Sequence, residues 1–228
     1  MAVGDFKVTV IGAINEAREK SKLSKVSTLD QDSDSLVKLH YLNDVVSELS
    51  DYANWQEQYA EAIVSVQTSV RDYAVSGVVV QNIHEVAIST RTAPLKRESI
   101  DNIRQLQRVG NFGSPYHWCL KGTNSEGNPV ITVDRWPTSN DGGYFNIGYY
   151  SKPAVYTTAM ASAVVPFPGR LVVQGLLVKT ILDESDGEPT QRYLTNLQLY
   201  EKMKDETYNR FNGDTGGDVH FRPGRKGR

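Results

Sequence analysis

Hydrophobic residues recur at steps of three and four near the start of the chain, which places them on one face of an α-helix. Asp5 is positioned to cap a first helix whose apolar face carries Val10, Ile14 and Ala17. A second helix is expected to begin at 32–35, where acidic residues interact favourably with the positive end of the helix dipole. The expected buried stripe of this second helix comprises Leu39, Leu42, Val46, Leu49 and Ala53.

The stretch 166–211 predicts a helical hairpin around which the rest of the chain is organised. Pro168 suits the first turn of a helix, where a missing N–H costs nothing, and residues 171–182 are apolar on nearly every side, as in a buried helix. Pro189 can open the second helix after an acidic turn. The pair carries more apolar surface than two helices can bury, so it requires other helices from this chain or from neighbouring subunits. The apolar stripe of the second helix comprises Tyr193, Leu197, Tyr200, Met203 and Phe211.

The central part of the chain has the Val- and Ile-rich alternation that is typical of β-strands. Residues 59–90 predict two or three strands. In a later strand, Phe145, Ile147 and Tyr149 alternate with polar or smaller residues, which indicates one buried face. The three strands expected in this second β region are 116–121, 130–134 and 144–150.

Two segments leave alternatives open. Residues 95–106 fit either a short helix or an ordered arm, and residues 154–165 fit either a helix of small residues or an extended link. With these included, the pattern predicts an α+β fold in which N- and C-terminal helices form a bundle and an antiparallel β domain is inserted between them. The expected parts are N-terminal helices at 1–55, the β-rich insert at 56–165, the helical hairpin at 166–211 and an extended basic arm at 212–228. The expected bundle core is Leu39, Leu42, Val46, Leu49, Leu176, Leu177, Ile181, Leu197, Tyr200 and Phe211.

The C-terminal arm differs in composition from the rest of the chain. Glycines at five positions predict flexibility, and only Val219 and Phe221 offer apolar surface, so the arm alone is expected to be disordered. It is either a solvated terminus or a peptide that becomes ordered on a partner, with Phe221 as the anchor and the guanidinium groups on carboxylates or phosphates. Protein and nucleic acid are both open as that partner. The expected contact residues are Phe221, Arg222, Pro223, Arg225, Lys226 and Arg228.

The amino-acid composition and net charge of the chain exclude several classes of protein. The chain has 228 residues, of which 39% are hydrophobic, so a packed core is available. A formal net charge of −2 argues against a general polyanion binder, and the single cysteine, Cys119, excludes an internal disulfide framework. The apolar stretch 171–182 is interrupted by polar residues and is shorter than the ~20 residues that a bilayer span needs. We expect no signal peptide and no membrane segment, and a soluble protein made in the cytoplasm.

Catalytic motifs are not evident. The chain has no Gly-x-x-x-x-Gly-Lys-Ser/Thr loop and no Gly-x-Ser-x-Gly elbow, and its four histidines lack metal-ligand spacing. His117 and Cys119 lie two apart on a strand and so share a face. A thiol–imidazole pair is the functional interpretation, but a buried Cys beside a satisfied His is favoured because no neighbouring group is expected to orient the pair. We expect no catalytic residue, no cofactor and no metal.

Two further residue groups receive structural interpretations. The carboxylates at 30–34 and 183–188 lie in polar turns and are expected to be solvated rather than to form an acid–base pair. An aromatic group in and after the last strand could stack bases, but packing and subunit contacts are favoured because only Lys152 supplies a cation there. This group comprises Tyr144, Phe145, Tyr149, Tyr150 and Tyr156.

The order of these parts carries a resemblance. Gly113-Ser114-Pro115-Tyr116 begins a strand, the strand that starts at Val130 ends at Pro137, the strand to Tyr150 leads into Ser151-Lys152-Pro153, and Pro166-Phe167-Pro168 opens the helix pair. Two helices, a β-rich insert, two helices and a basic tail in this order resemble the head-to-tail adaptor family of tailed bacteriophages, of the tail tubular protein A type.

The resemblance implies a non-enzymatic virion protein at the head-to-tail junction. It implies a homo-oligomeric ring of about twelve subunits between the portal protein and tail proteins of the nozzle or tube, with the C-terminal arm on the portal. Genomic DNA would pass through the channel without sequence-specific binding, which the near-neutral charge suits. The alternatives are another neck or tail component such as a tube terminator, a nucleic-acid-binding module that uses the basic tail, and an enzyme centred on His117 and Cys119.

Overall fold

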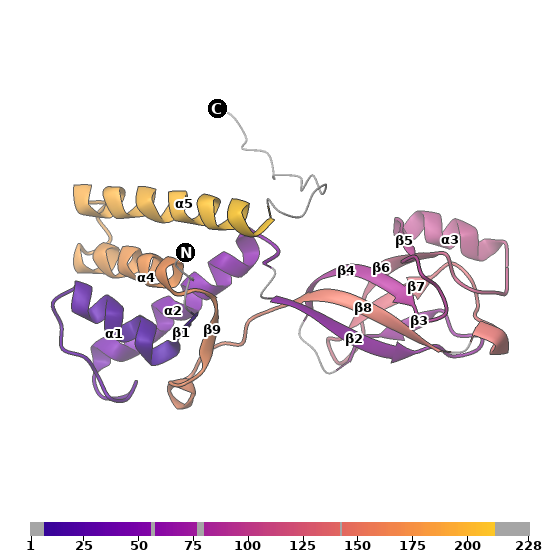
Figure 1. Cartoon of the computed structure of the whole chain (residues 1–228), viewed down its shortest axis with the longest axis horizontal. Helices are drawn as coiled ribbons and strands as arrows, with labels where there is room; N and C mark the ends of the chain where they lie inside the picture. Colours follow the sequence, from indigo (N-terminus) through magenta and orange to yellow (C-terminus); the bar gives the residue numbers. More distant parts are fainter. Residues whose placement is uncertain (1–6, 56–57, 77–79, 142, 213–228) are drawn as a thin grey trace. The chain divides into compact units, whose positions relative to one another are not determined.

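The computed structural model describes residues 7–55, 58–76, 80–141 and 143–212, which divide between two units. Residues 1–55 and 155–228 belong to a helical unit, and residues 56–154 belong to a β unit (Figure 1). The chain therefore leaves the helical unit after α2, completes the β unit and returns. Helices together with largely antiparallel sheets confirm the predicted α+β class.

The helical unit is built around α4. Its helices are α1 (Val10–Lys20), α2 (Ser33–Tyr52), α4 (Gly169–Glu184) and α5 (Gln191–Asn212), and a short ribbon pairs β1 (Lys7–Thr9) with β9 (Val164–Pro168). Helix α4 contacts α1, α2 and α5, and Figure 1 shows it between α5 and the two N-terminal helices. Because α4 has neighbours on several sides, its all-round apolar sequence is buried, as the pattern predicted.

Two helix starts differ from prediction because the β1–β9 ribbon precedes both helices. Helix α1 begins at Val10, and Thr9 caps it by accepting a hydrogen bond from the Gly12 amide at 3.1 Å, so the predicted cap at Asp5 is wrong. Pro168 ends β9 and stands at the N-cap position of α4, one residue before the helix. In contrast, α2 begins where predicted, with the Asp32 side chain accepting from the Ser35 amide at 2.7 Å. Helix α5 begins at Gln191, two residues after the predicted opening at Pro189, and is capped by Thr190, which accepts from the Tyr193 amide at 3.2 Å.

The segments that the sequence left open are resolved by the structure. Residues 100–108 form a helix, α3 (Ile100–Arg108), which is capped by Ser99. Most of 154–165 lies outside helices and strands, apart from a 3₁₀ turn at Thr158–Met160 and the start of β9 at Val164. The extended alternative is therefore the better description of that link.

The β unit consists of two sheets. One has the order β2–β8–β4, from Tyr59–Ser65, Tyr144–Ser151 and Val80–Ile88, and is antiparallel. The other has the order β3–β7–β6–β5, from Asp72–Ala74, Pro129–Val133, His117–Thr123 and Lys96–Arg97. The short β5 pairs with β6 in parallel, so the insert is not wholly antiparallel as predicted.

One hydrophobic core joins the two sheets. Phe145, Ile147 and Tyr149 of β8 point into it, which confirms the predicted buried face of that strand. Phe145 meets Tyr73 of the other sheet edge-to-face, with ring centroids 4.9 Å apart. The indole of Trp118 on β6 is also buried in this core. Two sheets that share one core define a small β-sandwich covered at one side by α3.

Close packing in the helical unit depends on Gly175 of α4. A Cβ at this position would lie 2.8 Å from Val45 Cγ1 of α2 and 2.9 Å from Tyr200 Cε2 of α5. Both neighbours are buried, so neither can move into solvent.

We expect Gly175→Ala to lower the free energy of unfolding by about 1–2 kcal/mol, because the overpacking penalty exceeds the gain in helix propensity of about 1 kcal/mol. Urea denaturation followed by circular dichroism at 222 nm measures this change. A variant more stable than the wild type would contradict the close approach of the three helices.

Candidate functional site

The residues predicted to form the partner-binding arm lie outside the described residues. This applies to Phe221, Arg222, Pro223, Arg225, Lys226 and Arg228.

The predicted bundle-core residues lie in the helical unit, although not in one cluster. Leu39, Leu42, Val46, Leu49, Leu176 and Tyr200 belong to its main hydrophobic cluster, and Leu197 packs against that cluster half-buried. Leu177 and Ile181 are buried outside the cluster. The side chain of Phe211 lies outside the described part of the chain.

A buried ion cluster, which the sequence did not indicate, joins α1 to the start of α2. The Arg18 side chain is only 6% exposed, and its guanidinium donates to both carboxylate oxygens of Asp32, at 3.0 and 2.8 Å, and to Asp34. Its Nε also donates to the Ser24 carbonyl oxygen at 2.7 Å. Asp34 pairs in addition with the buried Lys38 at 2.7 Å.

Asp32 and Asp34 are therefore not simply solvated turn residues: each stays nearly 40% exposed, but both pair with the buried Arg18, which the sequence pattern did not predict. The hydrogen bond from the Ser35 amide, followed by the bond from Arg18, holds the pKa of Asp32 below its ordinary value. The sequence pattern did not predict these ion pairs because it places Arg18 on a solvated helix face. In the structure, residues 21–32 fold back over Arg18 and bury it.

A second charged group links α5 to α2. Lys204 is buried, and its ammonium donates to Glu48 at 3.0 Å and to Glu201 at 2.8 Å. Burial lowers the pKa of Lys204, but the two carboxylates outweigh it and the pKa is raised. This group fixes the position of α5 on the bundle, because a buried ammonium is tolerated only with its partners in place.

His117 and Cys119 do not form the pair that the enzyme alternative requires. The His117 Nδ1 atom lies 3.0 Å from Asp134 Oδ2, and the buried Asp134 also accepts from the backbone amides of Tyr116 and His117. The expectation that no group orients His117 is therefore wrong. Burial raises the pKa of the Cys119 thiol, which disfavours the reactive thiolate.

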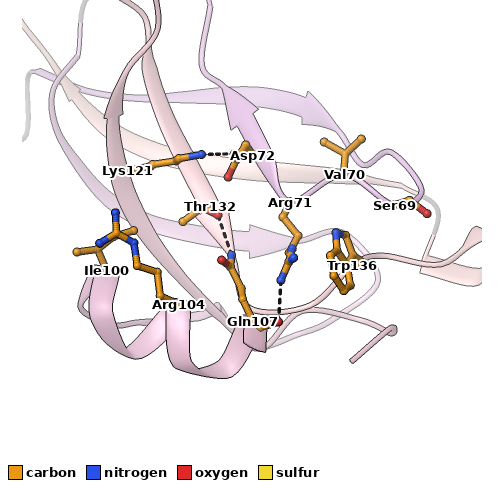
Figure 2. A pocket seen from close by; sticks show the side chains of 10 residues that line it. All are labelled: Ser69, Val70, Arg71, Asp72, Ile100, Arg104, Gln107, Lys121, Thr132 and Trp136. Atoms are coloured by element: carbon orange, nitrogen blue, oxygen red, sulfur yellow. Dashed lines mark hydrogen bonds and ion pairs between the residues drawn. The ribbon is translucent and has the colours of Figure 1, made fainter. Parts of the chain in front are cut away.

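A cavity of about 630 Å³ lies between α3 and the β3–β7–β6 face of the β unit (Figure 2). Gln107 of α3 closes one side, donating to Thr132 Oγ1 at 3.1 Å and to the Val133 carbonyl at 2.8 Å. Arg71 donates to the Gln107 carbonyl at 3.4 Å, and its guanidinium lies 3.4 Å from the centre of the Trp136 ring.

The cavity has an excess of positive charge. Arg71, Arg104 and Lys121 line it, whereas Asp72 is its one carboxylate among the described lining residues and already pairs with Lys121. Burial raises the pKa of Asp72, but hydrogen bonds with Lys121 and Thr132 outweigh it and hold the pKa below its ordinary value. Arginines in such a place can hold a carboxylate or phosphate of a partner.

Neither a membrane helix nor a metal site is found in the described residues. None of the helices there is both long and apolar enough to cross a bilayer. Within the same residues, His, Cys, Asp and Glu side chains do not gather in threes in a way that would hold a metal ion.

Comparison with known proteins gives one family. No curated protein matches the chain. The family described as SU10 adaptor protein matches residues 4–225, which is nearly the whole length and includes both units. The chain therefore belongs to the SU10 adaptor protein family, a family of bacteriophage head-to-tail adaptors.

Proposed function

We propose that the protein is a structural, non-enzymatic subunit of a ring that joins the portal to the tail of a bacteriophage, with genomic DNA passing through its channel. The observation that carries this proposal is the match to the SU10 adaptor protein family over residues 4–225. The protein's place is then the head-to-tail junction of the virion.

Each part of the chain has a role in this proposal. The helical unit makes the contacts between subunits, residues 212–228 clamp the portal, and the β unit faces the tail. Exposed apolar side chains on the outer surfaces of α2 and α5 support the first role, because such residues gain from a neighbouring copy. These side chains are Leu36, Val37, Leu194 and Leu199. Such head-to-tail contacts generate a closed ring when the rotation from each copy to the next adds up to a full turn. We expect a ring of about twelve subunits.

Electron microscopy of the purified protein, alone and mixed with a purified portal ring, tests the proposal. We expect a ring that stacks coaxially on the portal. A protein that stays monomeric and ignores the portal would overturn the proposed function and favour another neck component.

A further inference from the structure

The last turn of α3 and the connection that follows it to β6 display apolar side chains within a short stretch. The exposed fractions are 39% for Leu106, 69% for Val109, 61% for Phe112 and 49% for Tyr116. Single exposed apolar residues are ordinary, but several on one segment mark an interaction site. We call these four residues, together with Arg71, Arg91 and Arg135, the α3–β6 surface.

The arginines of this surface are held in place by aromatic rings. Arg91 and Arg135 both lie over the Tyr116 ring, at 3.8 and 4.7 Å from its centre. Phe112 stacks on Trp136 at 5.2 Å between centroids, and Arg71 lies over the same indole. Pre-positioned arginine and aromatic side chains are the residues that dominate binding energy in protein interfaces.

The carboxylates beside these arginines are already engaged inside the β unit. Asp134 accepts hydrogen bonds from two amides and contacts His117, and Asp141 accepts from Thr138 at 2.8 and 2.7 Å. Arg91 donates to the Pro115 carbonyl at 2.8 Å, and no ion pair of Arg71 or Arg91 occurs among the described residues. Arg135 also pairs with Asp134 at 3.9 Å, but its side chain is 37% exposed whereas that of Asp134 is 4% exposed, so the guanidinium is the charge that a partner can reach.

These observations favour a protein partner over a nucleic acid. Single-stranded nucleic acids bind by stacking bases on open aromatic faces, whereas Tyr116 and Trp136 already carry guanidinium groups. The apolar atoms of Val109 and Phe112 also gain nothing from a phosphate backbone. They gain from apolar side chains, and the guanidinium groups gain from carboxylates.

We propose that the α3–β6 surface docks a segment of a tail protein that carries carboxylates next to apolar side chains. This inference rests on the proposed function, because it takes the tail as the partner of the β unit. Phe112 and Val109 supply the apolar contact, and Arg91 and Arg135 set the charge that the partner must match.

Photocrosslinking in reconstituted portal–adaptor–tail particles tests the identity of the occupant. With p-benzoyl-phenylalanine in place of Phe112, we expect a crosslink to an acidic segment of a tail protein, located by mass spectrometry. The same group at Ile63 is the matched control, because Ile63 is 68% exposed on β2 of the same unit but outside the surface. A crosslink to a second copy, to the portal or to DNA, or no crosslink, would overturn the proposal.

Charge reversal gives an independent measurement with the full chain. We expect Arg91→Glu and Arg135→Glu each to lower affinity for the purified tail protein about tenfold or more, with a weaker salt dependence. Val109→Asp should lower the affinity by a similar factor, although Val109 takes part in none of the aromatic contacts described above. Ile63→Asp should leave the affinity unchanged. Equal affinities for all four variants and the wild type would refute the docking site. If the ring still forms on the portal in that case, only this inference fails and the proposed function stands.

Discussion

We expect Arg18→Met to lower the free energy of unfolding of the helical unit by about 3 kcal/mol. Methionine keeps the buried stem but removes the charge that holds Asp32 and Asp34 together. The loss lies at the lower end of the range for buried ion pairs, because both carboxylates are nearly 40% exposed and regain water when the arginine is gone. Urea denaturation followed at 222 nm measures this change, since the helices dominate the signal there.

Lys20→Met is the matched control for this variant. Lys20 lies on the same helix and pairs with Glu16 at 3.4 Å, but both side chains are about half exposed. Exposed pairs at this spacing contribute only about 0.3–0.5 kcal/mol. If the two variants lost equal stability, the buried cluster would not hold the residues between α1 and α2.

The second large effect concerns the C-terminal arm. We expect deletion of residues 218–228 to abolish binding to the purified portal ring, because the deleted segment carries Phe221 and the basic residues that close the chain. The circular dichroism of the core should stay unchanged. Portal binding by the truncated protein at wild-type affinity would show that the C-terminal arm does not hold the portal.

A variant without the four basic residues separates the two features of the arm. Replacing its four terminal basic residues with glutamine keeps length and the Phe221 anchor. We expect weaker portal binding that no longer depends on salt, because the guanidinium and ammonium contacts are screened by ions. The replaced residues are Arg222, Arg225, Lys226 and Arg228.

Hydrophobic periodicity predicted those helices and strands whose ends are set by the local sequence and not by contacts with distant segments. Helix α2 begins at its acidic cap, and β8 buries alternate residues, because each pattern matches the period of its structure. The predicted start of α1 was wrong because residues 7–9 form a strand that pairs with β9. Strand β9 lies more than a hundred positions away in sequence. No local signal at Asp5 reports that pairing.

The charged contacts were the hardest to predict. Arg18 lies on the polar side of an amphipathic pattern, and only the fold-back of residues 21–32 makes it a buried residue. Asp134 reaches His117 because β6 and β7 pair antiparallel, with Trp118 opposite Val133. The three arginines of the α3–β6 surface come from three separate segments. Register and turn geometry, not spacing along the chain, bring them to one aromatic stretch.

The insertion of the β unit has a consequence for synthesis on the ribosome. All the strands of that unit lie between residues 59 and 151, whereas α1 and α2 must pack on α4, which begins only at Gly169. At about 5–20 residues per second, the apolar faces of the first two helices wait several seconds for their partner. The β unit is completed only at Ser151, shortly before α4 begins at Gly169. The nascent chain then carries a finished domain tethered to α1 and α2, whose apolar faces toward α4 a chaperone is suited to shield.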